Sequence, residues 1–385
     1  MLRSTAAVPL AALLLVSGVV CYQDDTTAPN GGGKPVVQVL LTDAPFPYAD
    51  VASVEVHVVR IDAAAIADSS NPSQAWVTIT TPDSVFDLLE LQQGQSALVG
   101  EGTLNAGQYE AVRMTINTAR SAIRFADGSP ATVRWPGDSG AELTLLTIVQ
   151  GSLVVADSGT AIVIDFDVGR SFLYDAATRV FDFIPYLRAV NRAATGSIAG
   201  VVTRDDGGTP QPVAYATITV FSGNPSFPAT WYVASSGHTD AAGAYRIGYL
   251  LAGSYIVSIE HPGLSALGAS VVAGVAVQVG GETPHSVTLH AVGGAGITIQ
   301  GALTIDVGQS TQLQAVVTDE QGQPVPSPAV TWSSLNQYVA TVSGTGEFAT
   351  VTGMAPGLAT IVGATSGLVG SVDVRVRGDS TAGGS

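Results

Sequence analysis

The chain has 385 residues, of which 46% are hydrophobic and 12% are charged, and its formal net charge at pH 7 is −16. This apolar content excludes wholesale disorder, and the length predicts two to four domains of about 100–200 residues each. Nucleic acid is excluded as a partner, because phosphate backbones are bound by clustered cations. Here Lys34 is the only lysine and the arginines are scattered along the chain.

The N-terminus carries the pattern of an export signal. One cation, Arg3, precedes an apolar run from Ala6 to Val20 that only Ser17 interrupts. A run of about 15 residues is too short for a comfortable membrane span of about 20, so we expect a signal peptide. The signal ends at Cys21, the only cysteine of the chain.

Cys21, placed directly after the apolar run, resembles the acylated cysteine of bacterial lipoproteins. The resemblance implies a membrane partner through an N-terminal lipid anchor. Tyr22, where an aspartate would favour the inner membrane, implies the outer membrane or cell surface. The alternative is ordinary secretory cleavage nearby, which removes Cys21 or leaves it as a free thiol. In both cases we expect an exported protein of the cell envelope without an internal disulfide.

The remainder of the chain predicts an all-β protein. Short alternating runs are separated by turn residues, as is typical of sandwiches and barrels. We predict three tandem β-sandwich domains that are independent of one another and follow in series. The predicted segments are a signal peptide at 1–21, a flexible linker at 22–35, domains at 36–192, 196–291 and 297–377, and a disordered tail at 378–385.

The first predicted domain has strands with one apolar face each, and alternation directs that face toward a core. Its motifs resemble an uncharacterised bacterial domain family, which implies a β-sandwich-like fold in exported proteins and implies no activity. The matching motifs are Leu41–Pro45, Val51–Val59, Asp87–Leu91 and Gly107–Arg113. The inward sets are Val54, Val56 and Val58; Val112, Met114 and Ile116; and Ile162, Ile164, Phe166 and Val168.

The second predicted domain repeats a turn followed by alternating aromatic and aliphatic residues. After the turn at Asp240–Gly243, alternation places Tyr245, Ile247 and Tyr249 on one face, and the next strand repeats this with Tyr255, Val257 and Ile259. The segment resembles the carboxypeptidase regulatory-like domain. The resemblance implies a small prealbumin-like β-sandwich with the three tyrosines at core positions.

The third predicted domain resembles the bacterial immunoglobulin-like group 2 domain, which is common in surface proteins. The matching motifs are Val307–Ser310, Val330–Ser334, Val339–Ser343 and Ala355–Ile361. We expect Trp332 to fill the centre of this sandwich.

One motif mimics a catalytic site. Gly137-Asp138-Ser139-Gly140 is similar to the nucleophile motif of trypsin-like proteases, with His57 upstream as the notional base. The motif continues with Ala141-Glu142 in place of the expected Gly-Pro, and Gly, Asp and Ser are also the usual residues of loops. We therefore predict no catalytic residues.

Asp165 and Asp167 flank Phe166 on one strand, so both carboxylates face the same way, about 7 Å apart. They are a candidate weak cation site. The alternative, which the regular alternation favours, is a solvated strand face opposite an apolar one. The histidines lack the spacing of metal ligands, so we expect no metal site and no cofactor.

Trp231 and Tyr232 are candidate sugar-binding residues on a loop that we expect to be exposed. Aromatic rings stack on sugar rings, and the prealbumin-like fold is related to carbohydrate-binding modules, although fold analogy alone is a weak argument. The alternative is that the aromatic residues of this domain pack in its core.

These patterns predict a non-catalytic, lipid-anchored envelope protein with a structural, adhesive or ligand-presenting role. The second hypothesis is a carbohydrate-binding accessory protein of the envelope, with a polysaccharide or another envelope protein as partner. The third is a periplasmic hydrolase that uses Ser139. The lack of a catalytic set supported by more than one motif favours the first two hypotheses over the third.

Overall fold

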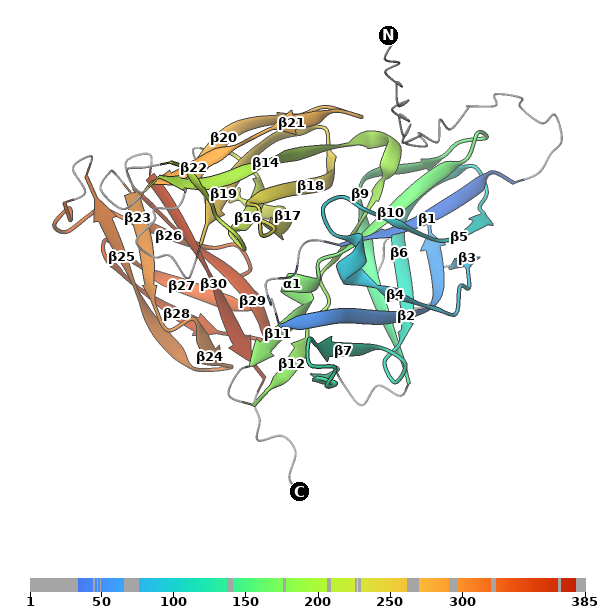
Figure 1. Cartoon of the computed structure of the whole chain (residues 1–385), viewed down its shortest axis with the longest axis horizontal. Coiled ribbons are helices and arrows are strands. Elements are labelled where there is room, and N and C mark those ends of the chain that lie inside the picture. The colour runs from blue at the N-terminus through green and yellow to red at the C-terminus, as the bar shows by residue number, and fades with distance from the viewer. Residues whose placement is uncertain are drawn as a thin grey trace, which may run out of the picture. The chain divides into compact units, whose positions relative to one another are not determined.

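The computed structural model describes residues 34–378, except for 44–45, 47, 49, 66–75, 137–140, 176–177, 206–208, 226, 228–229, 262–269, 291–295, 320–322 and 366–367. Cys21 and Ser139 therefore lie outside the described residues. The described chain is all-β and belongs to one compact unit, which confirms the predicted fold class (Figure 1). Its helical turns are α1 (Val168–Ser171), η1 (Leu88–Leu91) and η2 (Arg192–Ala194).

The first domain is built on a mixed ten-stranded sheet with the order β3-β2-β6-β9-β13-β10-β1-β5, and β4 and β7 also pair with β2. A small sheet of order β11-β12-β8 accompanies it. The bounds in the large sheet are β1 Val36–Thr42, β2 Val51–Ala64, β3 Val77–Thr80, β4 Ser84–Asp87, β5 Ala97–Thr103, β6 Gly107–Asn117, β7 Ala122–Phe125, β9 Glu142–Val155, β10 Thr160–Phe166 and β13 Leu187–Asn191. The small sheet contains β8 Thr132–Arg134, β11 Phe172–Asp175 and β12 Val180–Phe183.

The ends of the large sheet meet because two glycines allow it. A Cβ on Gly102 of β5 would lie 1.8 Å from the carbonyl oxygen of Ile79 in β3, and one on Gly100 would lie 2.2 Å from Thr80 Oγ1. Only a residue without a side chain permits this approach of β5 to β3. The sheet therefore curls around one core instead of remaining open.

The predicted inward sets of the first domain are confirmed. All ten of their side chains are buried in a single core. Aromatic side chains pack together in this core, and the ring centroids of Phe172 and Phe183 lie 4.8 Å apart. Val168 reaches the core from α1 rather than from a strand, since β10 ends at Phe166.

The second domain is a β-sandwich of two sheets. One sheet has the order β15-β14-β18, with β21 and β22 also paired to β14, and the other has the order β17-β16-β19-β20. The first sheet contains β14 Thr195–Asp205, β15 Gln211–Pro212, β18 Ala244–Leu251, β21 Glu282–Pro284 and β22 Val287–His290. The second contains β16 Thr217–Ser222, β17 Tyr232–His238, β19 Gly253–Glu260 and β20 Ser270–Val277. Tyr245 and Tyr255 lie in the core as expected, whereas Tyr249 packs outside it, against Leu40, Val163 and Val190 of the first domain.

The third domain is an eight-stranded sheet with the order β23-β25-β28-β27-β26-β29-β30-β24. Trp332 is half-buried between its two apolar clusters, and its indole Nε1 donates to the Gly346 carbonyl at 2.9 Å. The strands are β23 Gly296–Gly301, β24 Thr304–Asp306, β25 Ser310–Thr318, β26 Thr331–Ser334, β27 Ala340–Thr345, β28 Phe348–Gly353, β29 Gly357–Thr365 and β30 Leu368–Arg377.

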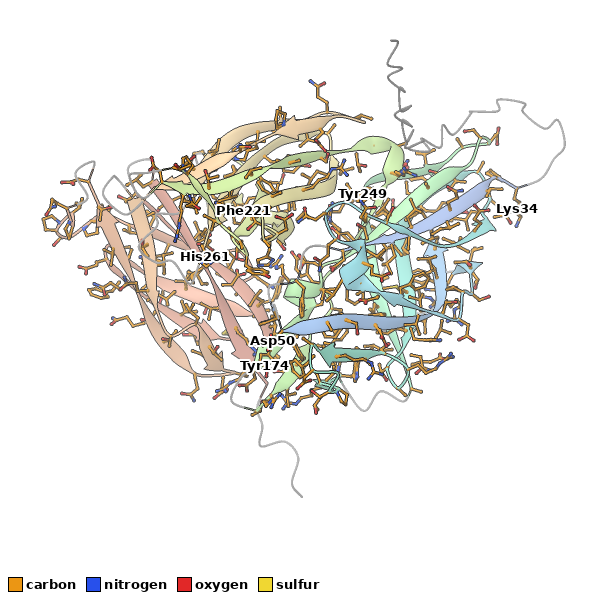
Figure 2. All side chains as sticks on the ribbon, in the orientation of Figure 1. Lys34, Asp50, Tyr174, Phe221, Tyr249 and His261 are labelled. Carbon is orange, nitrogen blue, oxygen red and sulfur yellow. The ribbon has the colours of Figure 1, made fainter. Side chains whose placement is uncertain are left out.

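The three domains pack against one another, so the prediction of independent sandwiches is wrong. Each domain keeps large side chains on an outer surface, and those surfaces are covered by a neighbouring domain. Phe221 and Tyr249 are two such residues of the second domain (both labelled in Figure 2). The contact between the second and third domains contains Phe221, Trp231, Val233, Ile256, Val271, Leu335 and Val369.

Candidate functional site

A buried ion pair lies where the first domain meets the second. Arg188 of β13 donates from Nε to Asp165 of β10 at 2.7 Å. The same guanidinium donates to the backbone carbonyls of Tyr249 at 2.7 Å and Gly248 at 3.0 Å, both in the second domain. Burial raises the pKa of the Asp165 carboxyl, and the positive charge of Arg188 opposes that rise. One arginine thus joins two domains through charge-assisted hydrogen bonds.

Asp167 forms a second link between these domains. Its Oδ1 accepts from the backbone N–H of Arg170 at 3.0 Å and caps α1, while Ser236 of β17 donates its hydroxyl to Oδ2. Burial raises the pKa of the Asp167 carboxyl, and the charge of Arg170 counters it. A buried carboxylate needs such partners, because an unpaired one costs several kcal/mol.

The interpretation of Asp165 and Asp167 as a solvated strand face is therefore wrong, since each is only 5% exposed. Alternation placed Asp165 correctly on the outer side of β10, whereas Asp167 follows the end of β10 and caps α1; Ser235 and Ser236 of the second domain contact the two carboxylates. Whether the two carboxylates bind a cation stays a prediction; in the structure Arg188 provides the charge that faces Asp165. Within the described residues, no group of three or more His, Cys, Asp or Glu side chains is arranged to hold a metal ion.

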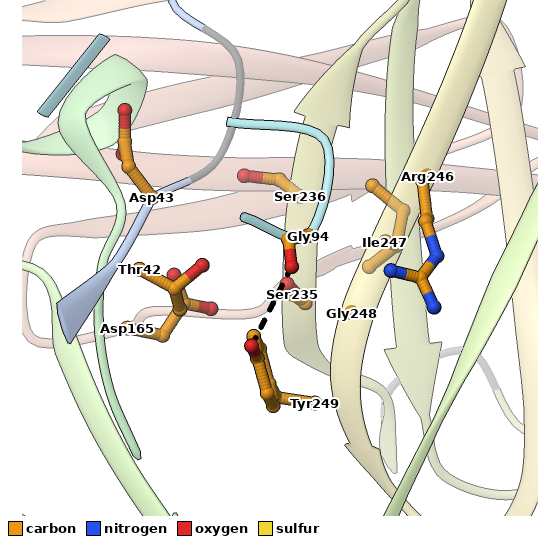
Figure 3. Close-up of a pocket in the computed structure, with 10 residues that line it drawn as sticks. All are labelled: Thr42, Asp43, Gly94, Asp165, Ser235, Ser236, Arg246, Ile247, Gly248 and Tyr249. Atoms are coloured by element: carbon orange, nitrogen blue, oxygen red, sulfur yellow. Dashed lines mark hydrogen bonds between the residues drawn. The ribbon is translucent and has the colours of Figure 1, made fainter. Parts of the chain in front are cut away.

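A small polar pocket lies beside these carboxylates. Thr42, Asp43 and Asp165 line it from the first domain, and Ser235 and Ser236 from the second (Figure 3). Its volume is about 10 Å³, which is the size of one water molecule. Tyr249 closes one side, with its hydroxyl 3.4 Å from the Gly94 carbonyl. This pocket is part of the domain contact and is too small for an organic ligand.

Two larger cavities lie where all three domains contribute residues. The first has a volume of about 240 Å³, and its polar wall includes Asp167, Arg170, Ser236, His238, Thr360 and Asp373. The second has a volume of about 280 Å³ and is lined by Gln150, Arg170, Tyr186, Tyr232, Val233, Leu335, Asn336 and Thr360. Arg170, Val233 and Thr360 belong to both walls, so the cavities are adjacent. We call the two together the junction groove.

Arg170 is the central polar residue of the junction groove. Its guanidinium lies over the Tyr186 ring, 3.8 Å from the ring centroid. The terminal nitrogen Nη1 is buried and has no hydrogen-bond partner within the described part of the chain. A buried donor without a partner costs about 1–3 kcal/mol.

Glu260, the last residue of β19, is a half-buried acid within electrostatic reach of Asp373 in the third domain. Burial and the negative charge of Asp373 together raise the pKa of its carboxyl to about 8. The side chain is therefore protonated at neutral pH.

The candidate aromatic pair divides into a buried and an exposed member. Trp231 is only 4% exposed, packs against Phe221 with the two rings tilted by 35°, and donates from Nε1 to the Asn224 carbonyl at 2.8 Å. The expectation of an exposed Trp231 is wrong, because its ring fills the contact with the third domain. Tyr232 is 55% exposed and lines the junction groove.

The notional catalytic histidine is inaccessible. His57 is fully buried in β2, and its Nε2 lies 3.2 Å from an Asp83 carboxylate oxygen. Its supposed nucleophile, Ser139, lies outside the described residues. No helix within the described ranges is long and apolar enough to cross a membrane.

The sequence missed Arg170, Arg188 and the junction groove. These residues are far apart in the chain from their partners in the other domains, and no local motif marks them. The one feature of the sequence that could have indicated them is the scarcity of cations. In a chain with 15 Lys and Arg and 31 Asp and Glu, each arginine is expected to pair with a carboxylate.

Three family models match the chain in succession. The family described as "Domain of unknown function (DUF4382)" matches residues 34–181, "Carboxypeptidase regulatory-like domain" matches residues 197–290, and "Bacterial Ig-like domain (group 2)" matches residues 295–376. The three domain resemblances drawn from the motifs are confirmed. The lipoprotein resemblance at Cys21 stays a prediction.

Solved structures that resemble the chain are bacterial surface proteins of low similarity. GBS52, the minor pilin of Streptococcus agalactiae, is 13% identical, with 66% of this chain and 96% of that chain covered and a TM-score of 0.20. BcpA, the major pilin subunit of Bacillus cereus, is 14% identical, with 47% and 69% covered and a TM-score of 0.19. Domains 4 and 5 of the S-layer protein SbsC are 16% identical, with 54% and 88% covered and a TM-score of 0.19. At these TM-scores the likenesses carry no argument about function. Among curated proteins there is no match.

Proposed function

We propose that the protein is a non-catalytic component of the cell envelope that holds three β-sandwich domains as one rigid surface outside the cell. The observation that carries the proposal is the set of arginines that cross domain boundaries. Arg188 joins the first domain to the second, and Arg375 of β30 donates to the Tyr174 carbonyl at 2.9 Å and to Asp182, both in the first domain. None of the three matched families is described as catalytic, which also supports a structural or adhesive role.

The proposed attachment is a lipid anchor at Cys21, which would place the domains at the outer membrane or cell surface. Mass spectrometry of the native N-terminal peptide tests it, and we expect acyl chains on Cys21. Cys21→Ala should release the protein from the membrane fraction. An unmodified Cys21, or a native N-terminus beyond residue 21, would refute the anchor.

A second candidate function is carbohydrate binding, favoured by the exposed ring of Tyr232 beside the polar residues of the junction groove. A glycan array probed with the mature protein tests this function. Retention of at least one polysaccharide class is the expected result, and no retention of any glycan would contradict it.

A further inference from the structure

The junction groove has the size of a small-molecule site. Its adjacent cavities of about 240 and 280 Å³ fall together within the range of about 300–1,000 Å³ that is usual for such sites. The two cavities share three lining residues, so a ligand with two linked groups could occupy both.

The aromatic residues of the groove come from two domains. Tyr232 lies at its exposed side, and Tyr186 lies beneath the Arg170 guanidinium. An aromatic ring offers an apolar face with a polar edge, which matches the C–H face and hydroxyl rim of a pyranose. Gln150 and Asn336 add side-chain amides that both donate and accept hydrogen bonds.

Arg170 supplies the guanidinium of the junction groove. It lines both cavities, in a wall that also carries hydroxyls and carboxylates. Asp373, on the same wall, accepts from Thr360 at 2.6 Å and retains acceptor capacity for a ligand hydroxyl. Residues that donate hydrogen bonds and residues that accept them therefore line the same groove, as recognition of a polyhydroxylated molecule requires.

The charge of the groove selects between neutral and acidic ligands. Two carboxylates, Asp167 and Asp373, accompany the single guanidinium of Arg170. A ligand with its own carboxylate or sulfate groups would meet net negative charge, which disfavours its binding.

We propose that the junction groove binds a neutral oligosaccharide, with one sugar ring on Tyr232 and the ring oxygen or hydroxyls of its neighbour on Arg170 and Asp373. The site rests on the second candidate function and gives it a location that requires all three domains. It differs from a site on the second domain alone, because Arg170 and Asp373 belong to the first and third domains.

The test uses the mature protein and neutral linear oligosaccharides of two to six hexose units, with polyuronates of equal length as the acidic comparison. An array identifies the binding sugar, and titration calorimetry then measures its Kd. The variants are Tyr232→Ala, Gln150→Ala and Arg170→Lys, which keeps the charge but loses the planar fork. Tyr338→Ala is the matched control, because Tyr338 is 90% exposed and lines neither cavity.

We expect Tyr232→Ala and Arg170→Lys each to weaken binding of the neutral sugar about tenfold or more. Gln150→Ala should weaken binding by a smaller factor, and Tyr338→Ala should leave the Kd unchanged. Circular dichroism verifies that each variant is folded. If Arg170→Lys does not fold, the Kd of Tyr232→Ala alone tests the site. Binding that all groove variants retain would overturn the site while leaving carbohydrate binding intact. Preference for polyuronates would overturn the neutral class. Failure of every glycan would overturn both the site and the second candidate function.

Discussion

The first domain contacts both neighbours through buried arginines, in addition to the apolar packing of Tyr249 on its surface, whereas the second and third domains share an apolar cluster. Arg188 and Arg375 both reach across a boundary of the first domain to backbone carbonyls and pair with buried or half-buried carboxylates. Phe221 and Trp231, by contrast, pack on Leu335 and Val369. The difference teaches that directional hydrogen bonds from two arginines join the first domain to its neighbours, while the second and third domains share buried apolar area.

The two kinds of contact also differ in how they fail. A buried ion pair contributes little net stability compared with apolar residues of the same shape, but loss of one partner leaves a charge uncompensated. Truncation of a side chain in an apolar contact costs only the free energy of the buried area that is removed and of the cavity that is left.

The largest effect is expected from Arg188→Ala. The change leaves the buried Asp165 carboxylate without its cation and two carbonyls of the second domain without their donor. We expect the free energy of unfolding to fall by about 4 kcal/mol. Urea denaturation followed by tryptophan fluorescence measures the change.

Two variants control this prediction. Arg192→Ala removes an exposed arginine near the same boundary and should change stability by less than about 0.5 kcal/mol. The double variant Asp165→Leu with Arg188→Met should be more stable than Arg188→Ala alone, because it removes both charges. A double variant as unstable as the single one would contradict the assignment of the ion pair.

The next effect is expected from Trp231→Ala in the apolar contact. Truncation of this buried ring should cost about 3 kcal/mol, at the low end for a buried tryptophan because the boundary can partly collapse. Thermal unfolding monitored by circular dichroism measures it. If Trp231 were an exposed sugar platform instead, the variant would keep its stability and lose binding.

A smaller effect with a distinct pH dependence is expected from Glu260→Gln. The unfolded chain releases this proton near pH 4.5 and the folded chain near pH 8, because burial and Asp373 raise the folded pKa. Wild-type stability therefore falls as pH rises through this window. We expect the variant to melt several degrees higher at pH 8 and to match wild type at pH 4. An equal difference at both pH values would show that the carboxyl does not titrate as described.

The smallest effect on stability is expected from Tyr232→Ala. Its ring is more than half exposed, so the free energy of unfolding should change by less than about 0.5 kcal/mol. The melting temperature should stay within a degree or two of wild type while sugar binding is lost. A clear loss of stability would mean that Tyr232 supports the domain contact, as Trp231 does.

Period-two alternation was enough to predict the sheets and their cores. Val54, Val56 and Val58 point inward because successive side chains of a strand alternate, and nothing distant is needed to know this. The same rule placed Asp165 on the opposite side of β10 from Ile162 and Ile164. It could not reveal what covers that side, because the cover comes from residues about 70–85 positions later in the chain.

Trp231 and Tyr232 illustrate the same limit for the candidate site. Tyr232 is the first residue of β17 and Trp231 directly precedes it, yet Trp231 is buried and Tyr232 is exposed. The sequence does not record that the third domain packs on the side of Trp231. Arg170 was missed for a similar reason, since its partners Tyr186 and Asp373 come from two domains.

Differential scanning calorimetry of the mature wild-type chain tests the central claim that the three domains form one unit. The buried contacts predict a single transition in which the calorimetric and van't Hoff enthalpies agree. Three separate transitions, each with its own midpoint, would contradict the claim and restore the picture of independent sandwiches in series.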